Sequence, residues 1–437
     1  MASFYIPLSG LNADSTAMNT IANNLSNMNT TAFKAQTTNF SDLFYQQIGT
    51  AGSGNEIQQG EGVQVASNAT DFAQGSYDTS GTTSSDVALD GSGFFVVNQG
   101  GANLLTRDGS FTENTSGNLV TAGGQTVMGY PATNGVVDTS APLTAITIPL
   151  TGQEQPAVAT TSINVTANLD SAASSGTTFP ASVTVYDSLG AAHTVTVTYK
   201  QEGIDPVTGD AEWSYSAALP ASDFTSGVST PVTGTLEFNA DGTLVSVAQT
   251  TPTAVASTPV GTAAGDISSV PLNFTGLSDG AADLSIGWNL LGTGSTPTIS
   301  QEDTASTQSA GTANGHAAGV CSGFTIGSDG TVSATYSNGQ TEAVGQLALA
   351  NVTNQQGLSL QGSGNYATTL ASGQASFGTA GTGGLGTIED STLEESNVNI
   401  SAEFSDLIIA QRGFEANSKA VTTFDTITQE TINMIHS

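Results

Sequence analysis

The chain has 437 residues, more than one compact hydrophobic core usually holds, so we expect two or more domains. Its 37 acidic and five basic residues give a net charge of -32, which disfavours nucleic acid and anionic membrane surfaces as partners. A single cysteine, Cys321, excludes an internal disulfide and a thiolate metal cage, and no apolar run is long enough for membrane insertion.

A helix is predicted at the N-terminus because apolar residues recur there at three- and four-residue steps. The residues between them are mostly Asn, Ser and Thr, which are weak helix formers because their side chains compete for backbone hydrogen bonds. Such a helix needs packing partners to be stable. The periodic apolar residues are Leu8, Leu11, Met18, Ile21, Leu25 and Met28.

The middle of the chain has the composition of turn-rich β-structure. Of 51 glycines, only Gly10 and Gly413 lie within residues 1–48 or 387–437. Residues 182–199 and 234–247 alternate in polarity with period two around a central turn, which predicts two β-hairpins. Asp-Gly pairs predict tight turns with positive φ. These pairs begin at Asp90, Asp108, Asp241 and Asp329.

A second helix is predicted near the C-terminus, where Ile400, Leu407, Phe414 and Val421 repeat every seven residues. Either Asn399 or Ser401 is a candidate N-cap. Coiled-coil spacing indicates that this helix pairs with the N-terminal one, although packing of both on the β body as ordinary surface helices remains an alternative.

The expected fold is therefore mainly β with α-helical termini. Antiparallel barrel or sandwich domains are nested one inside another, and the terminal helices pair as a coiled coil. The expected segments are a terminal helical domain (1–34 plus 391–437), extended connections (35–70 plus 377–390), a first β domain (71–149 plus 296–376) and an inserted outer β domain (150–295).

Two signatures at opposite ends of the chain resemble those of the bacterial flagellar axial family of rod and hook proteins. "NNLSNMNTTAFK" at 23–34 is similar to the N-terminal signature, and residues 393–425 are similar to the C-terminal one. Within the body, residues 129–133, 183–197 and 330–358 resemble the hook members. The chain departs from the family pattern at Ser26 and Ala32, where Ala and Gly are usual.

Periodicity and this resemblance together indicate residues for assembly into a polymer. In the N-terminal motif they are Leu11, Met18, Ile21, Asn23, Asn24, Leu25, Asn27, Thr30, Phe33 and Lys34. In the C-terminal motif they are Leu393, Glu394, Ser396, Asn397, Val398, Phe404, Leu407, Ala410, Gln411, Arg412, Phe414, Asn417 and Val421.

The resemblance implies a structural subunit of the flagellar hook, which polymerises into a curved flexible tube and transmits torque from rod to filament. The implied partners are further copies of the chain, rod and hook–filament junction proteins, the hook cap and the flagellar export apparatus. The expected location is extracellular, after export without a cleaved signal peptide. Two alternatives stay open: a distal rod-type axial protein, and a secreted β-rich adhesin.

Enzymatic readings have little support in the sequence. His193, His316 and His436 show no pair at metal-ligand spacing, and each is more typical of a surface or packing residue. "GTGGLG" at 381–386 matches a phosphate-binding pattern, but no helix directly follows it and too little chain remains for a dinucleotide fold. We therefore expect no catalytic residue, no cofactor and no metal site.

Overall fold

The computed structural model describes residues 4–50, 56–80, 82–206, 209–251, 255–260 and 268–435. His436 lies outside the described residues. The chain divides into two compact units. The first comprises Met1–Leu150, Gly323–Thr335 and Thr341–Ser437, and the second comprises Thr151–Ser322 and Tyr336–Gln340. No helix among the described residues is long and apolar enough to span a membrane.

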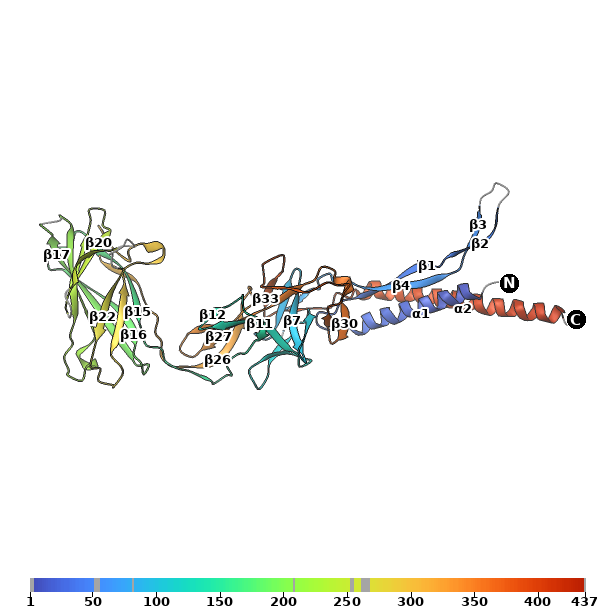
Figure 1. Ribbon diagram of the computed structural model, residues 1–437, viewed down its shortest axis with the longest axis horizontal. Coiled ribbons are helices and arrows are strands. Elements are labelled where there is room, and N and C mark those ends of the chain that lie inside the picture. Colours follow the sequence, from blue (N-terminus) through green and yellow to red (C-terminus); the bar gives the residue numbers. More distant parts are fainter. Residues whose placement is uncertain are drawn as a thin grey trace. The chain divides into compact units, whose positions relative to one another are not determined.

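The predicted terminal helices are present in the first unit and lie side by side as α1 (Tyr5–Ser26) and α2 (Ile400–Ile435) (Figure 1). A glycine in each helix leaves room for a side chain of the other helix. A Cβ atom added at Gly10 would lie 2.5 Å from Nδ2 of Asn417, and one added at Gly413 would lie 3.0 Å from the Asp14 carboxylate. The predicted pairing is thus confirmed. Each of the two helices thus has a glycine at a point where it contacts the other helix.

The first turn of α2 is capped by Asn399 rather than by Ser401. The Asn399 side-chain oxygen accepts hydrogen bonds from the backbone N–H groups of Ser401 and Ala402, at 3.1 and 3.2 Å. Glu403 lies in the same turn.

A two-stranded ribbon follows α1 along the chain and lies beside it (Figure 1). Its strands β1 (Gln36–Asp42) and β4 (Val63–Thr70) are antiparallel, and the chain between them forms a second hairpin of β2 (Tyr45–Thr50) and β3 (Glu56–Gly60). Thr38 in β1 hydrogen-bonds Thr20 of α1 at 2.9 Å, and the backbone N–H of Val63 donates to Ser9 Oγ at 3.1 Å.

The β body of the first unit is built around β7 (Phe94–Gln99). Phe95 and Val97 face one apolar cluster, whereas Phe94 and Val96 face another, so both sides of β7 are buried. Its neighbours β8 (Ala102–Thr106) and β11 (Thr126–Thr133) pair with it in antiparallel fashion.

The remaining strands of the first unit are mostly short. They are β5 (Tyr77–Asp78), β6 (Val87–Asp90), β9 (Phe111–Glu113), β10 (Leu119–Thr121), β12 (Val136–Val137), β13 (Thr144–Ala145), β27 (Thr331–Tyr336), β28 (Thr341–Leu347), β29 (Leu349–Asn351), β30 (Ser359–Gly362), β31 (Asn365–Ala367), β32 (Ser376–Gly378), β33 (Thr387–Asp390) and β34 (Leu393–Glu394), with a 3-10 turn η3 (Gln355–Gly357).

The second unit is a sandwich of two sheets around one apolar core. Trp288 from one sheet packs with Tyr199 and Tyr215 from the other, at ring-centroid distances of 6.2 and 5.3 Å. The six-stranded sheet runs in order through β16 (Thr178–Tyr186), β17 (Ala192–Ile204), β18 (Ala211–Ala218), β19 (Val232–Phe238), β20 (Leu244–Thr251) and β21 (Val255–Pro259).

The five-stranded sheet differs from the expectation in two respects. Its strands are β15 (Ser162–Asp170), β22 (Ser269–Phe274), β23 (Leu284–Asn289), β24 (Ile299–Glu302) and β25 (Thr307–Ala313). First, β15 pairs in parallel with β23 and β24, so the sandwich is not purely antiparallel. Second, β24 and β25 belong to this sheet although we expected the inserted domain to end at residue 295. Outside the two sheets lie β14 (Glu154–Gln155), β26 (Gly319–Ile326), η1 (Ala221–Asp223) and η2 (Thr293–Ser295).

Both predicted hairpins are confirmed, as β16–β17 and β19–β20. Three of the four Asp-Gly turns are also as expected, because Gly91, Gly242 and Gly330 have φ of 104°, 75° and 84°. The prediction is wrong for Gly109, which has no positive φ. That glycine instead admits a neighbouring backbone, since a Cβ atom there would lie 1.8 Å from the carbonyl oxygen of Val87.

Candidate assembly site

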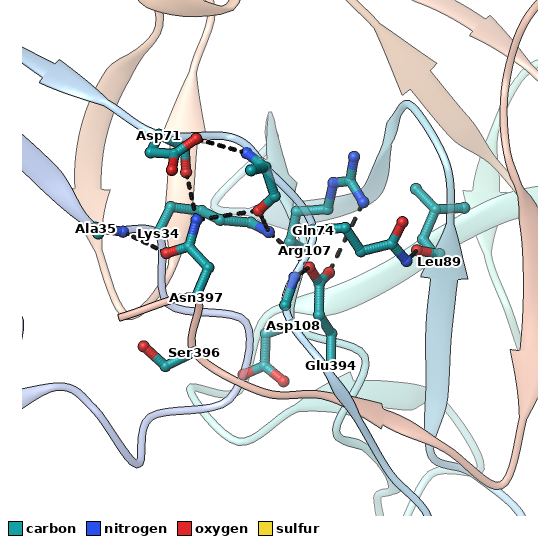
Figure 2. A network of polar contacts seen from close by, with 12 residues as sticks. Lys34, Ala35, Asp71, Gln74, Leu89, Arg107, Asp108, Glu394, Ser396 and Asn397 are labelled. Atoms are coloured by element: carbon teal, nitrogen blue, oxygen red, sulfur yellow. Dashed lines mark hydrogen bonds and ion pairs between the residues drawn. The ribbon is translucent and has the colours of Figure 1, made fainter. Parts of the chain in front are cut away.

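The two sequence signatures meet in the first unit through a buried ion pair (Figure 2). Nζ of Lys34 lies 2.6 Å from Oε1 of Glu394, and neither side chain has exposed surface. Lys34 also donates to the backbone oxygen of Ala73 at 2.8 Å, and Glu394 accepts from the backbone N–H of Gly75 at 2.8 Å. Burial lowers the pKa of Lys34, and the hydrogen bond and charge of Glu394 oppose this shift.

Arg107 brings a second cation to the same carboxylate. Its Nη1 lies 3.7 Å from Oε2 of Glu394, and its Nη2 donates to the backbone oxygen of Gly91 at 2.8 Å. The guanidinium also lies 5.4 Å from the ring centre of Phe94. Two of the five basic residues of the chain therefore surround one glutamate.

Asn397 closes this network by binding backbone groups on both sides (Figure 2). Its side-chain oxygen accepts from the N–H of Ala35 at 2.7 Å, and its amide donates to the carbonyls of Asp71 and Ala73 at 2.8 and 3.0 Å. We call Lys34, Arg107, Glu394 and Asn397 the anchor. It joins the segment after α1, the end of the ribbon and the segment before α2.

The usual glycine of the N-terminal signature is Ala32 in this chain, and it adopts a left-handed conformation with φ of 54°. Its backbone N–H donates to the carbonyl oxygen of Glu394 at 2.7 Å, which places this turn against the anchor. An L-residue other than glycine is strained in this region of φ by roughly 1–2 kcal/mol. The departure from the family pattern is therefore a strained position.

Asn24 is a second buried polar link. Its side chain binds both backbone groups of Gln36, accepting from the N–H at 3.0 Å and donating to the oxygen at 2.8 Å, and it also donates to Glu403 Oε1 at 2.9 Å. One asparagine thus connects α1, the ribbon and α2. Burial raises the pKa of Glu403, the hydrogen bond from Asn24 opposes this, and the nearby charge of Asp406 adds to it.

The predicted assembly residues fall into buried, half-buried and exposed groups. Asn417 hydrogen-bonds Asp14 across the helix pair at 2.9 Å, while Ile21 and Ala410 are buried. Thr30 bonds Asn27, which in turn bonds Asn23. The half-buried members of the set are Leu11, Met18, Leu25, Asn27, Phe33, Leu393, Ser396, Val398, Leu407, Asn417 and Val421, and the exposed ones are Asn23, Thr30, Phe404, Gln411, Arg412 and Phe414.

Three exposed apolar residues of α2 were not among the assembly residues chosen from the sequence. Ile408, Ile409 and Ile427 are 51%, 67% and 55% exposed, and the predicted Phe404 is 52% exposed. Phe404 and Ile408 are four residues apart and so share one face of the helix, whereas Ile409 and Ile427, which are about five turns apart, share a neighbouring face. That spacing, offset from the predicted heptad of Ile400, Leu407, Phe414 and Val421, is the signal that could have identified these residues. We call Phe404, Ile408, Ile409 and Ile427 the outer stripe.

The ribbon and its hairpin also expose large apolar side chains. Phe40, Phe44, Tyr45 and Ile48 are 47%, 91%, 61% and 59% exposed. None of them was selected from the sequence, because the segment 35–70 was expected only to connect domains. Several large apolar side chains exposed on one short segment are typical of protein–protein contact sites.

Family comparison matches four parts of the chain to flagellar protein descriptions. Residues 4–34 match "Flagella basal body rod protein", and residues 88–168 match "Flagellar hook protein FlgE/F/G D1 domain". Residues 156–316 match "Flagellar basal body protein FlaE D2 domain", and residues 389–434 match "Flagellar basal body rod FlgEFG protein C-terminal".

Similar proteins extend over the whole chain. The flagellar hook protein FlgE of Escherichia coli is 34% identical over 98% of this chain and 98% of its own length, and that of Salmonella typhimurium is 33% identical over 99% and 100%. The crystal structure of Helicobacter pylori FlgE2 has a similar fold, with a TM-score of 0.53 and 14% identity over 72% of this chain and 99% of that one. The chain belongs to the flagellar hook protein family.

Proposed function

We propose that this subunit of the flagellar hook polymerises through the outer stripe of α2 and the exposed apolar residues of the ribbon. This proposal rests on a separation of roles in the first unit. Three of the four anchor residues and Asn24 are buried and bind groups of the same chain, whereas the outer stripe is exposed. Burying an exposed large apolar side chain in a subunit contact contributes about 1.5–3 kcal/mol. The assembled state therefore stabilises helices that have weak intrinsic propensity.

Repetition of one such contact by a rotation that does not close generates a helical tube rather than a ring. In this proposal the terminal helices, residues 1–34 and 391–437, form the inner tube, and the first β domain and the inserted domain lie outside them. The tube is curved and flexible and transmits torque from rod to filament. The buried ion pair of the anchor supports this role, because it holds the terminal helices to the β body of the same subunit while torque passes through it.

The outward face of the second unit supports contacts that exchange during bending. In β16 and β17, buried valines alternate with outward residues such as Ser182, Thr184 and Thr194. Hydroxyl groups bind neighbouring protein groups and water with similar energy, so contacts between such faces slide at low cost.

We further propose rod proteins, hook–filament junction proteins, the hook cap and the flagellar export apparatus as partners. The family is one of structural flagellar hook proteins located outside the cell, and we propose no catalytic activity. The distal rod-type and adhesin alternatives have less support, because the full-length relatives are named hook proteins.

Replacement of Ile409 tests the proposed contact. Ile409→Asp should prevent polymerisation, because a buried carboxylate without a basic partner carries a large desolvation cost. Ile409→Leu is the matched control and should polymerise. Electron microscopy and sedimentation report assembly, and the melting temperature of the monomer should stay the same in both variants because Ile409 is 67% exposed. Tubes of Ile409→Asp that match the wild type in yield would disprove the contact.

A further inference from the structure

His193 of the second unit lies among three carboxylates that come from separate segments. Its Nε2 is 3.0 Å from Oδ2 of Asp187 in the β16–β17 turn and 3.6 Å from Oδ2 of Asp279 in the loop between β22 and β23. Its Nδ1 is 2.8 Å from Oδ2 of Asp223 at the end of η1. Both ring nitrogens thus face carboxylate oxygens.

Local hydrogen bonds hold two of the three carboxylates, those of Asp187 and Asp279, so that the second oxygen of each points at the ring. Oδ1 of Asp187 accepts from the backbone N–H groups of Leu189 and Ala191 at 2.8 and 2.9 Å. Oδ1 of Asp279 accepts from the N–H of Ala281 at 3.0 Å. The Oδ2 atoms of Asp187 and Asp279 therefore converge on Nε2 in a preformed arrangement.

The cluster carries excess negative charge in a sheltered place. The side chain of Asp187 has no exposed surface and that of His193 is 9% exposed. Three carboxylates around one imidazole leave a net charge of about -2 even when the ring is protonated. Lys200 is the only lysine or arginine in the second unit, and it pairs with Glu202 at 2.8 Å. No basic side chain of the unit neutralises the negative charge of the cluster, whereas a bound cation would neutralise it.

We propose that Nε2 of His193 and the Oδ2 atoms of Asp187 and Asp279 bind one divalent transition-metal ion of the zinc class. In a tetrahedral site with metal–ligand bonds of about 2.0–2.1 Å, neighbouring ligand atoms lie about 3.3 Å apart. The observed separations of 3.0 and 3.6 Å bracket this value, and all three ligand atoms lie within 4.8 Å of one another. A water molecule completes the coordination.

The donor set and its surroundings favour zinc over calcium. Calcium prefers oxygen ligands alone, whereas an imidazole with two carboxylates suits zinc and related ions. Asp223 acts as a positioning residue, because a carboxylate on the second ring nitrogen orients a metal-binding imidazole. The ion would link the β16–β17 turn of the six-stranded sheet to the β22–β23 loop of the five-stranded sheet, and so join both layers of the sandwich.

Titration of the full-length monomer with Zn²⁺ tests the site, with Co²⁺ as a spectroscopic probe. We expect one ion per chain, a visible Co²⁺ absorption typical of four-coordinate geometry, and a higher melting temperature with Zn²⁺ than with chelator. His193→Gln should lose this binding, and Asp279→Asn, a milder change at a side chain that is 29% exposed, should weaken it at least tenfold. Asp223→Asn should weaken it by about 10–100-fold while keeping the Co²⁺ spectrum.

His316→Gln is the matched control, because His316 is the other described histidine of the second unit and contacts Ala317 and Asn338 instead of carboxylates. It should bind like the wild type. Three results would overturn the proposal: no stoichiometric binding by the wild type, undiminished binding by His193→Gln and Asp279→Asn, or equal loss in His316→Gln. A melting temperature that depends on His193 but not on added metal would likewise overturn it and would assign the imidazole a charged, metal-free role.

Discussion

Glu394 is the acidic member of the anchor, and its replacement by alanine leaves two buried cations without their carboxylate. Lys34 keeps its bond to Ala73, and Arg107 keeps its bond to Gly91 and its contact with the Phe94 ring. Breaking a buried ion pair by removing one partner costs about 3–5 kcal/mol. We expect Glu394→Ala to reduce the local stability of the anchor by this amount, with partial relief where Lys34 loses its proton, because burial already lowers its pKa.

Lys34→Met is the comparison variant, and it should cost less. Glu394 then retains Arg107 at 3.7 Å and the backbone N–H of Gly75 at 2.8 Å, so it is not left alone in the interior. Loss of one hydrogen bond to a charged group costs about 1.5–3 kcal/mol. The expected order of destabilisation is therefore Glu394→Ala above Lys34→Met.

Amide hydrogen exchange is the suitable measurement, because a chain of two units need not unfold in a single step. Exchange at the amides of Ala32 and Ala35, which donate to Glu394 and Asn397, reports the opening of the anchor. Amides in β17 of the second unit serve as the internal control and should not change. A cost below about 1 kcal/mol for Glu394→Ala, or a larger cost for Lys34→Met, would refute the reasoning.

Three further predictions follow from the first unit. Ala32→Gly should raise the stability of the first unit by up to about 1 kcal/mol in urea denaturation. The strain relieved at the left-handed position exceeds the extra conformational entropy that glycine loses on folding, and a clear loss of stability would contradict this. Burial raises the pKa of Glu403 above 4.5, so its contribution to stability is full below that pH and is lost as the pH rises through the raised value. Glu403→Gln should therefore melt above the wild type at pH 7 and together with it at pH 4, and the reverse trend would count against this. Trypsin should cut the monomer after the exposed Arg412 and Lys419 before it cuts after the buried Lys34. Mass spectrometry over a time course would show this order, and early cleavage at Lys34 would disprove the anchor in the free monomer.

The secondary structure was largely predictable because its signals are local. The hairpin β16–β17 follows from alternation over residues 182–199, and the terminal helices follow from three- and four-residue steps. The cap at Asn399 was one of two candidates, since neighbouring side chains compete for the same backbone groups. Gly109 was misread because its role depends on Val87 of another strand, which no local pattern reveals.

The sequence by itself determined which residues belong to the two signatures, which family they resemble and which parts of the chain form helices and strands. Only the tertiary structure decided what the residues of the signatures do. Lys34 and Glu394 are 360 positions apart, and their role as a buried pair exists only once the chain brings them within 2.6 Å. The same holds for His193, whose carboxylate neighbours Asp223 and Asp279 come from other segments. Periodicity and composition depend on residues that are close along the chain, whereas ion pairs and ligand sites depend on residues that only the folded chain brings together.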